Sequence, residues 1–202
     1  MKQLKLSSCL TQMNAFIDEE AIYDCAYTDC SIDANVLRKL DGCRFKNCKL
    51  TNFDFSQFEC LDVLFDHCEF VNVHFESAYF CRVHFINCRI SGMILSDSTL
   101  QDCLFDSCKG NYCNFGGSHF KDCILQESDF SSSGFIQCTF KKIQFKGCDF
   151  SNSDWFNTSL KGLDFSSSVI SNISVSSDSL TGVTVNEEQA LEFVKILGIQ
   201  IK

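Results

Sequence analysis

Large apolar side chains recur at every fifth residue along most of the chain. From Leu40 to Val185, nearly every residue whose number is a multiple of five is Phe, Leu, Ile, Val or Trp. Only Cys60 and Gly110 interrupt this series of central positions. An α-helix repeats every 3.6 residues and an ordinary strand every 2, so neither produces this pattern. Because an internal repeat outranks local propensity, the period decides the fold.

A second inward position, which we call the slot, lies two residues before each central one. Slots are small or apolar, and many hold cysteine: Cys43, Cys48, Cys68, Cys88, Cys103, Cys108, Cys113, Cys123, Cys138 and Cys148. The other three residues of each unit face outward. Four units can close one square coil, and stacked coils pair about 4.8 Å apart. The pattern therefore predicts an all-β solenoid, a quadrilateral β-helix. The absence of proline fits a fold in which nearly every N–H pairs.

The register of the repeat changes once, near the N-terminus. An earlier series of apolar residues is also spaced by five: Ile17, Ile22, Tyr27, Ile32 and Leu37. Leu40 follows only three residues after this series. We therefore expect a bend or bulge at residues 38–42, within a β-helix that spans residues 1–185. From Leu40 onward, a projecting loop would break the register unless its length were a multiple of five.

Residues 186–202 follow a helical pattern instead. Asn186 can cap a helix whose first turn ends at Gln189, which is a variant of the capping box. Its apolar residues are Ala190, Leu191, Phe193, Val194, Ile196 and Leu197, and Gly198 is a natural stop. The last coil of a solenoid exposes an unpaired edge. We expect this helix to cap that edge, to bind a second copy of the chain, or to do both.

Composition bounds the possible roles of the chain. Over its 202 residues we expect one domain and no secretory signal, and the sequence contains no apolar run of membrane-spanning length. Most of the 15 cysteines occupy slots, where parallel side chains suit disulfides poorly. We interpret them as reduced, small hydrophobes, which predicts a cytoplasmic protein. Zinc is the alternative, but the cysteine spacing of five is not that of a zinc ribbon. The histidines lie at outward positions: His67, His74, His84 and His119. We therefore predict no metal and no cofactor.

The net charge of −9 is unevenly distributed over the four walls of the predicted rod. The wall with centres Phe55, Phe75, Leu95, Phe115, Phe135, Trp155 and Val175, here called the acid-only wall, has no Lys or Arg. Its acidic residues are Asp54, Glu76, Asp97 and Asp154. The centres of the other three walls recur every 20 residues from Leu40, Phe45 and Leu50, and we name these walls after those residues. The Phe45 and Leu50 walls are close to balance in charge, and the Leu40 wall is slightly basic. This acidity is sparser than that of duplex DNA, which carries about one charge per 1.7 Å. Solubility alone explains some of it.

Catalytic and nucleic-acid-binding motifs are missing from the sequence. Ser118 and His119 are adjacent, but one faces inward and the other outward, so they do not form a nucleophile–base pair. Gly116 and Gly117 occupy outward corner positions, which a turn explains more simply than a phosphate-binding loop. No basic patch is evident from the sequence. We therefore expect neither an enzyme nor a protein that binds nucleic acid directly.

The repeat of a small residue, a polar residue, Phe or Leu and two polar residues resembles the pentapeptide repeat family along nearly the whole chain. Two segments resemble, more narrowly, the Qnr-type fluoroquinolone-resistance proteins of Gram-positive bacteria. One is residues 153–166, around Trp155. The other is the chain ending, with Leu180–Val183, Glu188–Ala190 and Leu197–Ile199.

This resemblance implies a right-handed β-helix that is a cytoplasmic homodimer. It also implies binding to DNA gyrase or topoisomerase IV, imitation of the DNA segment, and protection of the enzyme from fluoroquinolones. A second hypothesis is a structural or scaffold rod with an unrelated protein partner. A third, remote one is a metal or redox protein that uses the cysteines.

The candidate binding residues follow from these hypotheses. For a topoisomerase, they are the acid-only wall and the aromatic residue beside its last acid: Asp54, Glu76, Asp97, Asp154 and Phe156. A simpler interpretation is that Asp154 only bonds to its own turn. For the two-fold interface, they are Leu191, Phe193, Val194 and Leu197. The simpler alternative there is a helix that only caps the last coil.

Overall fold

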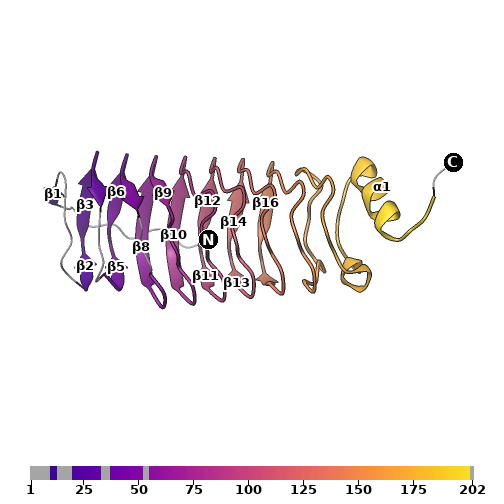
Figure 1. The fold of residues 1–202 in the computed structure, drawn as a ribbon, viewed down its shortest axis with the longest axis horizontal. Helices are drawn as coiled ribbons and strands as arrows, with labels where there is room; N and C mark the ends of the chain where they lie inside the picture. Colours follow the sequence, from indigo (N-terminus) through magenta and orange to yellow (C-terminus); the bar gives the residue numbers. More distant parts are fainter. Residues whose placement is uncertain (1–9, 13–19, 33–36, 52–54, 201–202) are drawn as a thin grey trace.

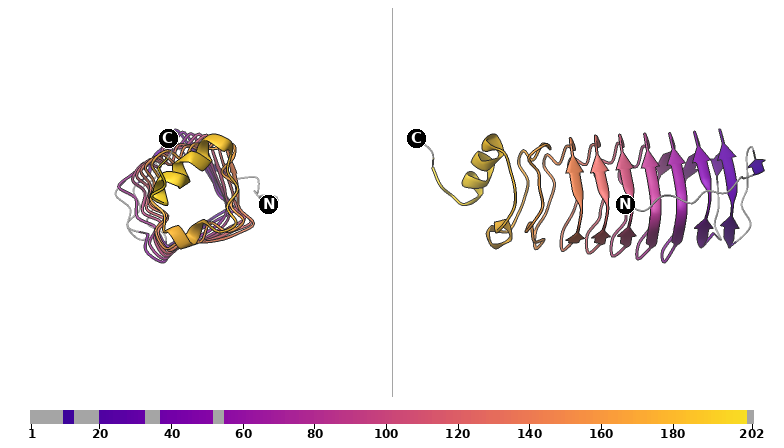
Figure 2. Two further views of the ribbon diagram at one scale, coloured as in Figure 1. Left: turned by 90° about the vertical axis from the view of Figure 1, so that its right-hand side faces the viewer. Right: turned by 180° about the vertical axis from the view of Figure 1, so that it is seen from behind.

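The chain folds into a right-handed parallel β-solenoid that ends in one short α-helix (Figure 1). The structure is a computed structural model, and it describes residues 10–12, 20–32, 37–51 and 55–200. Seen along the rod, successive coils superimpose in a four-sided outline (Figure 2). The predicted quadrilateral β-helix is confirmed.

Short parallel strands form the walls, and their pairing runs along the rod axis. The strands are β1 Leu10–Gln12, β2 Ala21–Tyr23, β3 Cys25–Thr28, β4 Ser31–Ile32, β5 Lys39–Asp41, β6 Arg44–Lys46, β7 Lys49–Thr51, β8 Glu59–Asp66, β9 Glu69–Val71, β10 Tyr79–Ile86, β11 Thr99–Gln101, β12 Leu104–Asp106, β13 His119–Lys121, β14 Ile124–Gln126, β15 Thr139–Lys141 and β16 Gln144–Lys146. A 3₁₀ turn at Ser177–Leu180 and helix α1, Glu187–Ile196, follow. Isolated bridges continue the pairing beyond β16.

The pairing register gives the length of a coil. From β5 onward, partners are 20 residues apart, as in Phe45 with Phe65 and Asp164 with Thr184. The coil that begins with β2 is two residues shorter, because Ile22 pairs with Leu40. The pairing before it is shorter still, with Leu10 of β1 opposite Cys25 of β3. Residues 39–41, where we expected a bend, form the regular strand β5. The shortening therefore falls between Ile32 and β5, since Ile32 still pairs with Leu50 at the shorter separation.

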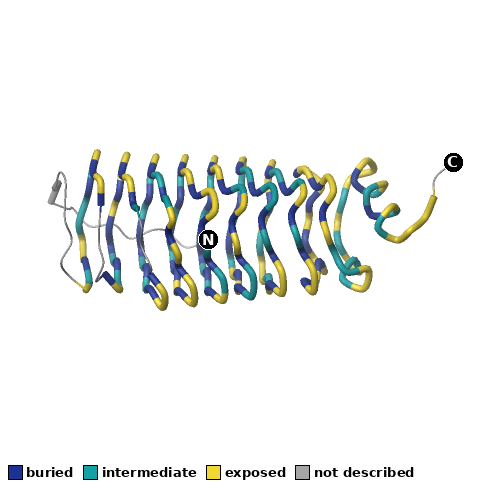
Figure 3. Tube along the Cα trace, viewed as in Figure 1, coloured by how far each residue is buried: buried dark blue, intermediate teal, exposed yellow. Residues whose placement is uncertain are grey.

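Central side chains stack inside the rod, and the buried positions recur along each wall (Figure 3). Rings from successive coils lie nearly parallel, with centroids 5.1 Å apart for Phe65–Phe85 and 4.9 Å apart for Phe85–Phe105. Parallel stacking follows from the in-register coils, and the tilted contacts between walls fill the centre of the rod. Aromatic rings therefore stack from Phe45 to Phe105 along this wall, and Leu125 takes the next place.

The two interruptions of the repeat are compensated within the core. Cys60 is small at a centre, but the slot before it holds the large Phe58, and both are fully buried. At Gly110, an added Cβ would lie 2.8 Å from the ring of Phe130. That ring therefore fills the space which a central side chain would otherwise occupy. In both places a neighbouring ring packs into the core beside the small residue.

The corners of the rod need a left-handed backbone. Residues two positions after a centre repeatedly have positive φ, and Asn47, Asp97 and Gly117 are examples. Asn, Asp and Gly tolerate this conformation best, which explains why they recur at these outward positions. Gly117 is thus a turn residue, as the sequence indicates.

Helix α1 begins with the predicted capping box and lies at the C-terminal end of the rod. The Asn186 side chain accepts a hydrogen bond from Gln189 N at 2.9 Å, and the Gln189 side chain accepts one from Asn186 N at 2.9 Å. Gln189 also donates to Phe165 O at 2.8 Å. Phe193 packs against the core as its last buried ring. The helix is therefore bound to the last coil through polar and apolar contacts.

Candidate functional site

The acid-only wall is a continuous outer face with few side chains that project far. Isolated β-bridges join the residues that stand just before the centres in successive coils. These residues are His74, Ile94, Asn114, Gly134, Asp154 and Ser174. Glu76 and Asp97 are exposed, and Asp154 is half-buried. Asp54 lies outside the described residues. In-register stacking puts Asp154 about 14 Å beyond Asp97, at about 4.8 Å per coil. The structure thus places these acids on one wall, but well apart.

Two of these acids lie close to neighbouring backbone. Asp97 has positive φ, and a Cβ at Gly117 in the next coil would collide with its Oδ1. Asp154 Oδ1 accepts a hydrogen bond from Phe156 N at 3.0 Å. One oxygen of Asp154 therefore bonds to its own turn. The carboxylate still faces a wall that has no Lys or Arg among its described residues.

The predicted aromatic contact residue projects from the same wall. Phe156 is 52 % exposed, and Ile136 occupies the equivalent position one coil earlier with 37 % exposure. Gln137 N donates to Phe156 O at 3.1 Å, which holds the two coils in register. Sequence reasoning missed Ile136, because the repeat constrains inward positions and says little about outward ones. Its signal was a second large apolar residue, next to Phe156, in an outward row that otherwise holds small or polar residues.

Charged residues of the Leu40 wall are paired in the N-terminal half of the rod. Lys39 lies 2.8 Å from Glu59, and Arg82 forms two hydrogen bonds, of 2.7 and 2.6 Å, with the buried Asp62. The contact with Glu59 raises the pKa of Lys39, and the contact with Asp62 raises that of Arg82. Both pairs join successive coils. Because each pair is neutral, this part of the wall offers little net charge to a binding partner.

The C-terminal half of the same wall carries a row of lysines that the sequence analysis missed. Lys121 pairs directly with Lys141, and Lys161 takes the same place one coil later. All three are exposed, and no described carboxylate lies within 4 Å of them. Like charges opposite each other are unfavourable. The Leu40 wall therefore has a basic end, which corrects the prediction that no basic patch exists.

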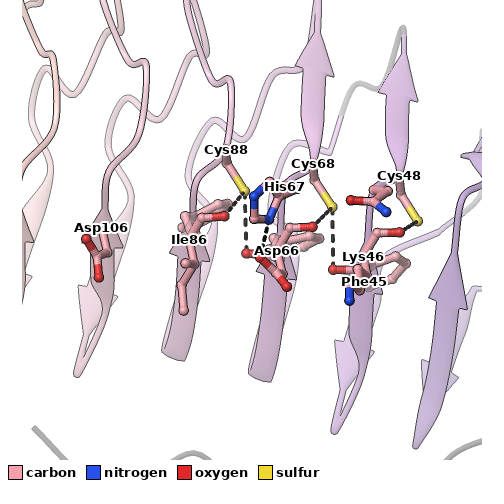
Figure 4. Close-up of polar contacts among 12 residues, drawn as sticks. Phe45, Lys46, Cys48, Asp66, His67, Cys68, Ile86, Cys88 and Asp106 are labelled. Atoms are coloured by element: carbon pink, nitrogen blue, oxygen red, sulfur yellow. Dashed lines mark hydrogen bonds and ion pairs between the residues drawn. The ribbon is translucent and has the colours of Figure 1, made fainter.

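A ladder of thiols occupies the slots before Leu50, Phe70 and Ile90 (Figure 4). Its members are Cys48, Cys68 and Cys88. Cys68 donates to Phe45 O and Cys88 to Phe65 O, at 3.5 and 3.4 Å, so each thiol contacts the previous coil. Within the described residues, no group of His, Cys, Asp and Glu is arranged to hold a metal ion. The ladder is a packing element in this geometry.

The C-terminal end divides the predicted interface residues into two groups. Leu191 and Leu197 are 50 % and 52 % exposed, and Val194 is half-buried. Phe193 is only 7 % exposed and belongs to the core, so its ring does not reach the surface where we expected it. The helix does cap the last coil, and it leaves an apolar face toward solvent. None of the described helices is long or apolar enough to cross a membrane.

Comparisons with known proteins agree with this architecture. The family model for a pentapeptide repeat region matches residues 58–129, and that for pentapeptide repeats matches residues 113–152. No curated protein is similar enough in sequence to count as a relative. Pentapeptide-repeat solenoids are typically non-catalytic proteins with structural or protein-binding roles.

Several solved structures are similar, at low identity. QnrB1, a plasmid-mediated fluoroquinolone resistance protein, is 17 % identical, with a TM-score of 0.40 over 95 % of this chain and 100 % of the other. HetL from the cyanobacterium Nostoc sp. strain PCC 7120 is 10 % identical, with a TM-score of 0.43 over 76 % and 84 %. A protein of the Arabidopsis thaliana thylakoid lumen is 14 % identical, with a TM-score of 0.36 over 56 % and 72 %. We draw nothing about function from them. Residues 58–152 of this chain match the family models for pentapeptide repeats. The same five-residue repeat extends beyond them on both sides.

Proposed function

We propose that the protein is a DNA-mimicking partner of DNA gyrase or topoisomerase IV, which it protects from fluoroquinolones. The observation that carries the proposal is the acid-only wall. Glu76, Asp97 and Asp154 lie on one face of a straight rod, with no described Lys or Arg between them. The sequence resemblance of residues 153–166 to Qnr-type proteins supports the same partner.

A basic DNA-binding surface would meet this wall with complementary potential. Complementary potentials chiefly raise the association rate and the specificity, and salt screens them over about 10 Å. The charge is sparser than that of DNA, so shape and apolar contacts must contribute as well. Phe156 and Ile136 supply exposed apolar area on the same wall.

A homodimer would extend the wall across a two-fold axis. The exposed face of α1 with Leu191, Val194 and Leu197 supports this assembly, because an exposed apolar face favours association. In a two-fold interface one substitution acts on both subunits. We expect Val194→Glu to give a folded monomer by light scattering, with the rod's melting temperature nearly unchanged. An unchanged dimer would place the interface elsewhere, and a parent that is already monomeric would leave α1 only its capping role.

The second candidate is a scaffold rod that binds an unrelated protein. The bond from Phe156 N to Asp154 favours it, because this carboxylate has a structural use without any partner. The two candidates differ in salt dependence, since imitation of a polyanion is electrostatic.

The decisive experiment is gyrase supercoiling with ciprofloxacin, in the presence and absence of the protein. The test variant combines Asp54→Asn, Glu76→Gln, Asp97→Asn and Asp154→Asn, which keeps shape and removes four charges. We expect lower gyrase affinity, loss of its salt dependence and loss of protection.

The control variant changes four acids of the Phe45 wall in the same way: Asp66, Asp106, Glu127 and Asp164. Circular dichroism and thermal melting should show that both variants are folded. If the control weakens binding more than the test variant, the acid-only wall is not the contact surface. If the parent protein neither binds nor protects gyrase, the scaffold role becomes the better proposal.

A further inference from the structure

Two exposed apolar side chains form a small ledge on the acid-only wall. Ile136 and Phe156 occupy the same outward position in successive coils and are 37 % and 52 % exposed. The neighbouring positions in this row hold the small residues Ser96, Gly116 and Ser176. The rod does not need these two side chains, because the core is complete beneath them in Phe135 and Trp155.

Beside this ledge, Gly134 is half-buried, and its backbone carries no side chain to cover it. Gly134 lies between Asn114 and Asp154 in the bridged row, one coil from each. An added Cβ would meet only Asn114 Oδ1, at 3.6 Å, and φ is not in the left-handed region. The fold therefore does not require glycine here. Glycine also weakens a strand, and it often marks a site that another group approaches closely.

The charge around this open position is negative. Asp154 flanks Gly134 on one side, and its carboxylate uses Oδ1 for the Phe156 backbone N–H. No Lys or Arg occurs among the described residues of the wall, so this charge is not neutralised locally. A ligand over Gly134 would thus meet a carboxylate, an aromatic ring and a bare backbone.

An arginine side chain fits this combination of groups. Its guanidinium is planar and stacks on aromatic rings, while its N–H groups pair with carboxylates. Its aliphatic stem covers apolar surface, which suits Ile136. Lysine offers a compact, strongly hydrated charge and cannot stack in the same way.

We propose that Gly134, Ile136, Asp154 and Phe156 form a docking site for an arginine that projects from a protein partner. The identity of that partner rests on the proposed function, in which a basic DNA-binding surface supplies the arginine. The site adds a defined contact to an otherwise diffuse electrostatic attraction.

A steric block that changes no charge tests the site most sharply. Gly134→Val places a branched side chain over the open backbone, in a conformation that valine adopts readily. The probe is a fluorescein-labelled hexa-arginine peptide, with hexa-lysine for comparison, measured by fluorescence anisotropy at low salt. We expect Gly134→Val to bind hexa-arginine about tenfold more weakly than the parent protein, a difference of ~1.4 kcal/mol.

The matched control is Ser174→Val, at the equivalent outward position one coil beyond Asp154. It should leave hexa-arginine binding unchanged. Phe156→Ala should remove most of the preference for arginine over lysine. Equal affinity of Gly134→Val and the parent protein would overturn the proposal, and so would equal loss in the Ser174→Val control.

The same variants separate this inference from the proposed function. If Gly134→Val still binds and protects gyrase like the parent protein, the arginine site is not the gyrase contact, although gyrase remains the partner. If the parent protein has no effect on gyrase but Gly134→Val loses hexa-arginine binding, the site stands and its partner is another basic protein.

Discussion

Two sets of slots in the same rod use different chemistry. Thiol slots such as Cys68 and Cys88 donate to a carbonyl of the previous coil at 3.5 and 3.4 Å. Hydroxyl slots such as Ser98 and Thr158 donate to the equivalent carbonyl at 2.7 and 2.6 Å. The hydroxyls also accept a backbone N–H from the previous coil, for example from Ala78 to Ser98 at 3.0 Å.

The difference shows what the fold requires at a slot. Size is common to both sets, because both are buried beside large central side chains. Only the hydroxyls both donate a hydrogen bond to the previous coil and accept one from it, as Ser98 does. Thiols are weak donors and acceptors, so they contribute mainly as small hydrophobes. The following predictions test this distinction.

Central side chains should matter equally in both sets. Phe105 follows the thiol slot Cys103, and Phe135 follows the hydroxyl slot Ser133. All four are buried. Truncation of either ring to alanine should lower the free energy of unfolding by about 3–5 kcal/mol, through lost burial and the cavity that remains. Urea unfolding monitored by circular dichroism measures this. A variant that melts like the parent protein would contradict the five-residue register.

The sequence predicts the inward positions well, because burial enforces their period. It also predicts the helix cap, since Asn186 and Gln189 stand at the required spacing. It places Phe193 on the wrong side of α1, because Phe193 and Val194 are adjacent apolar residues and only packing on the last coil distinguishes them. The sequence does not predict outward features such as the exposed Ile136 and the lysine row. They depend on which residues 20 apart become neighbours, rather than on the repeat itself.

A hydroxyl slot should lose stability when its oxygen is removed. Ser118 Oγ accepts a hydrogen bond from Ser98 N at 3.0 Å and donates to Leu95 O. Ser118→Ala would leave both backbone groups without this partner in the buried interior, at a cost of about 1–3 kcal/mol. Chemical unfolding checks this value. The exposed Ser171→Ala serves as a control and should change stability by less than ~0.5 kcal/mol.

Thiol slots should instead make stability depend on alkaline pH. Burial raises the pKa of Cys113 to about 12, so the folded state keeps a proton that the unfolded chain loses above its own pKa, near 9. The unfolded state then binds fewer protons, and stability falls as pH rises from about 9 to 12. Each such thiol contributes about 1.4 kcal/mol per pH unit in this window. Unfolding of Cys113→Ser at pH 8, 9 and 10 under reducing conditions should show a shallower fall than the parent protein. Parallel curves would contradict a buried, protonated Cys113.

Exchange of a thiol for a hydroxyl should have the smallest effect of all. Cys68→Ser keeps the size of the slot and moves a stronger donor toward Phe45 O, which the thiol contacts at 3.5 Å. The serine could also accept from Cys48 N, as Ser128 accepts from Cys108 N at 2.9 Å. Lost apolar burial opposes these new bonds, so we expect a net change within about 0.5 kcal/mol in the free energy of unfolding. The reverse change, Ser128→Cys, removes that acceptor from the Cys108 N–H and should cost more, about 1–2 kcal/mol. If Cys68→Ser destabilises the rod as much as Ser128→Cys does, the thiols contribute more than size, and the sulfur contacts of the ladder hold coils together in their own right.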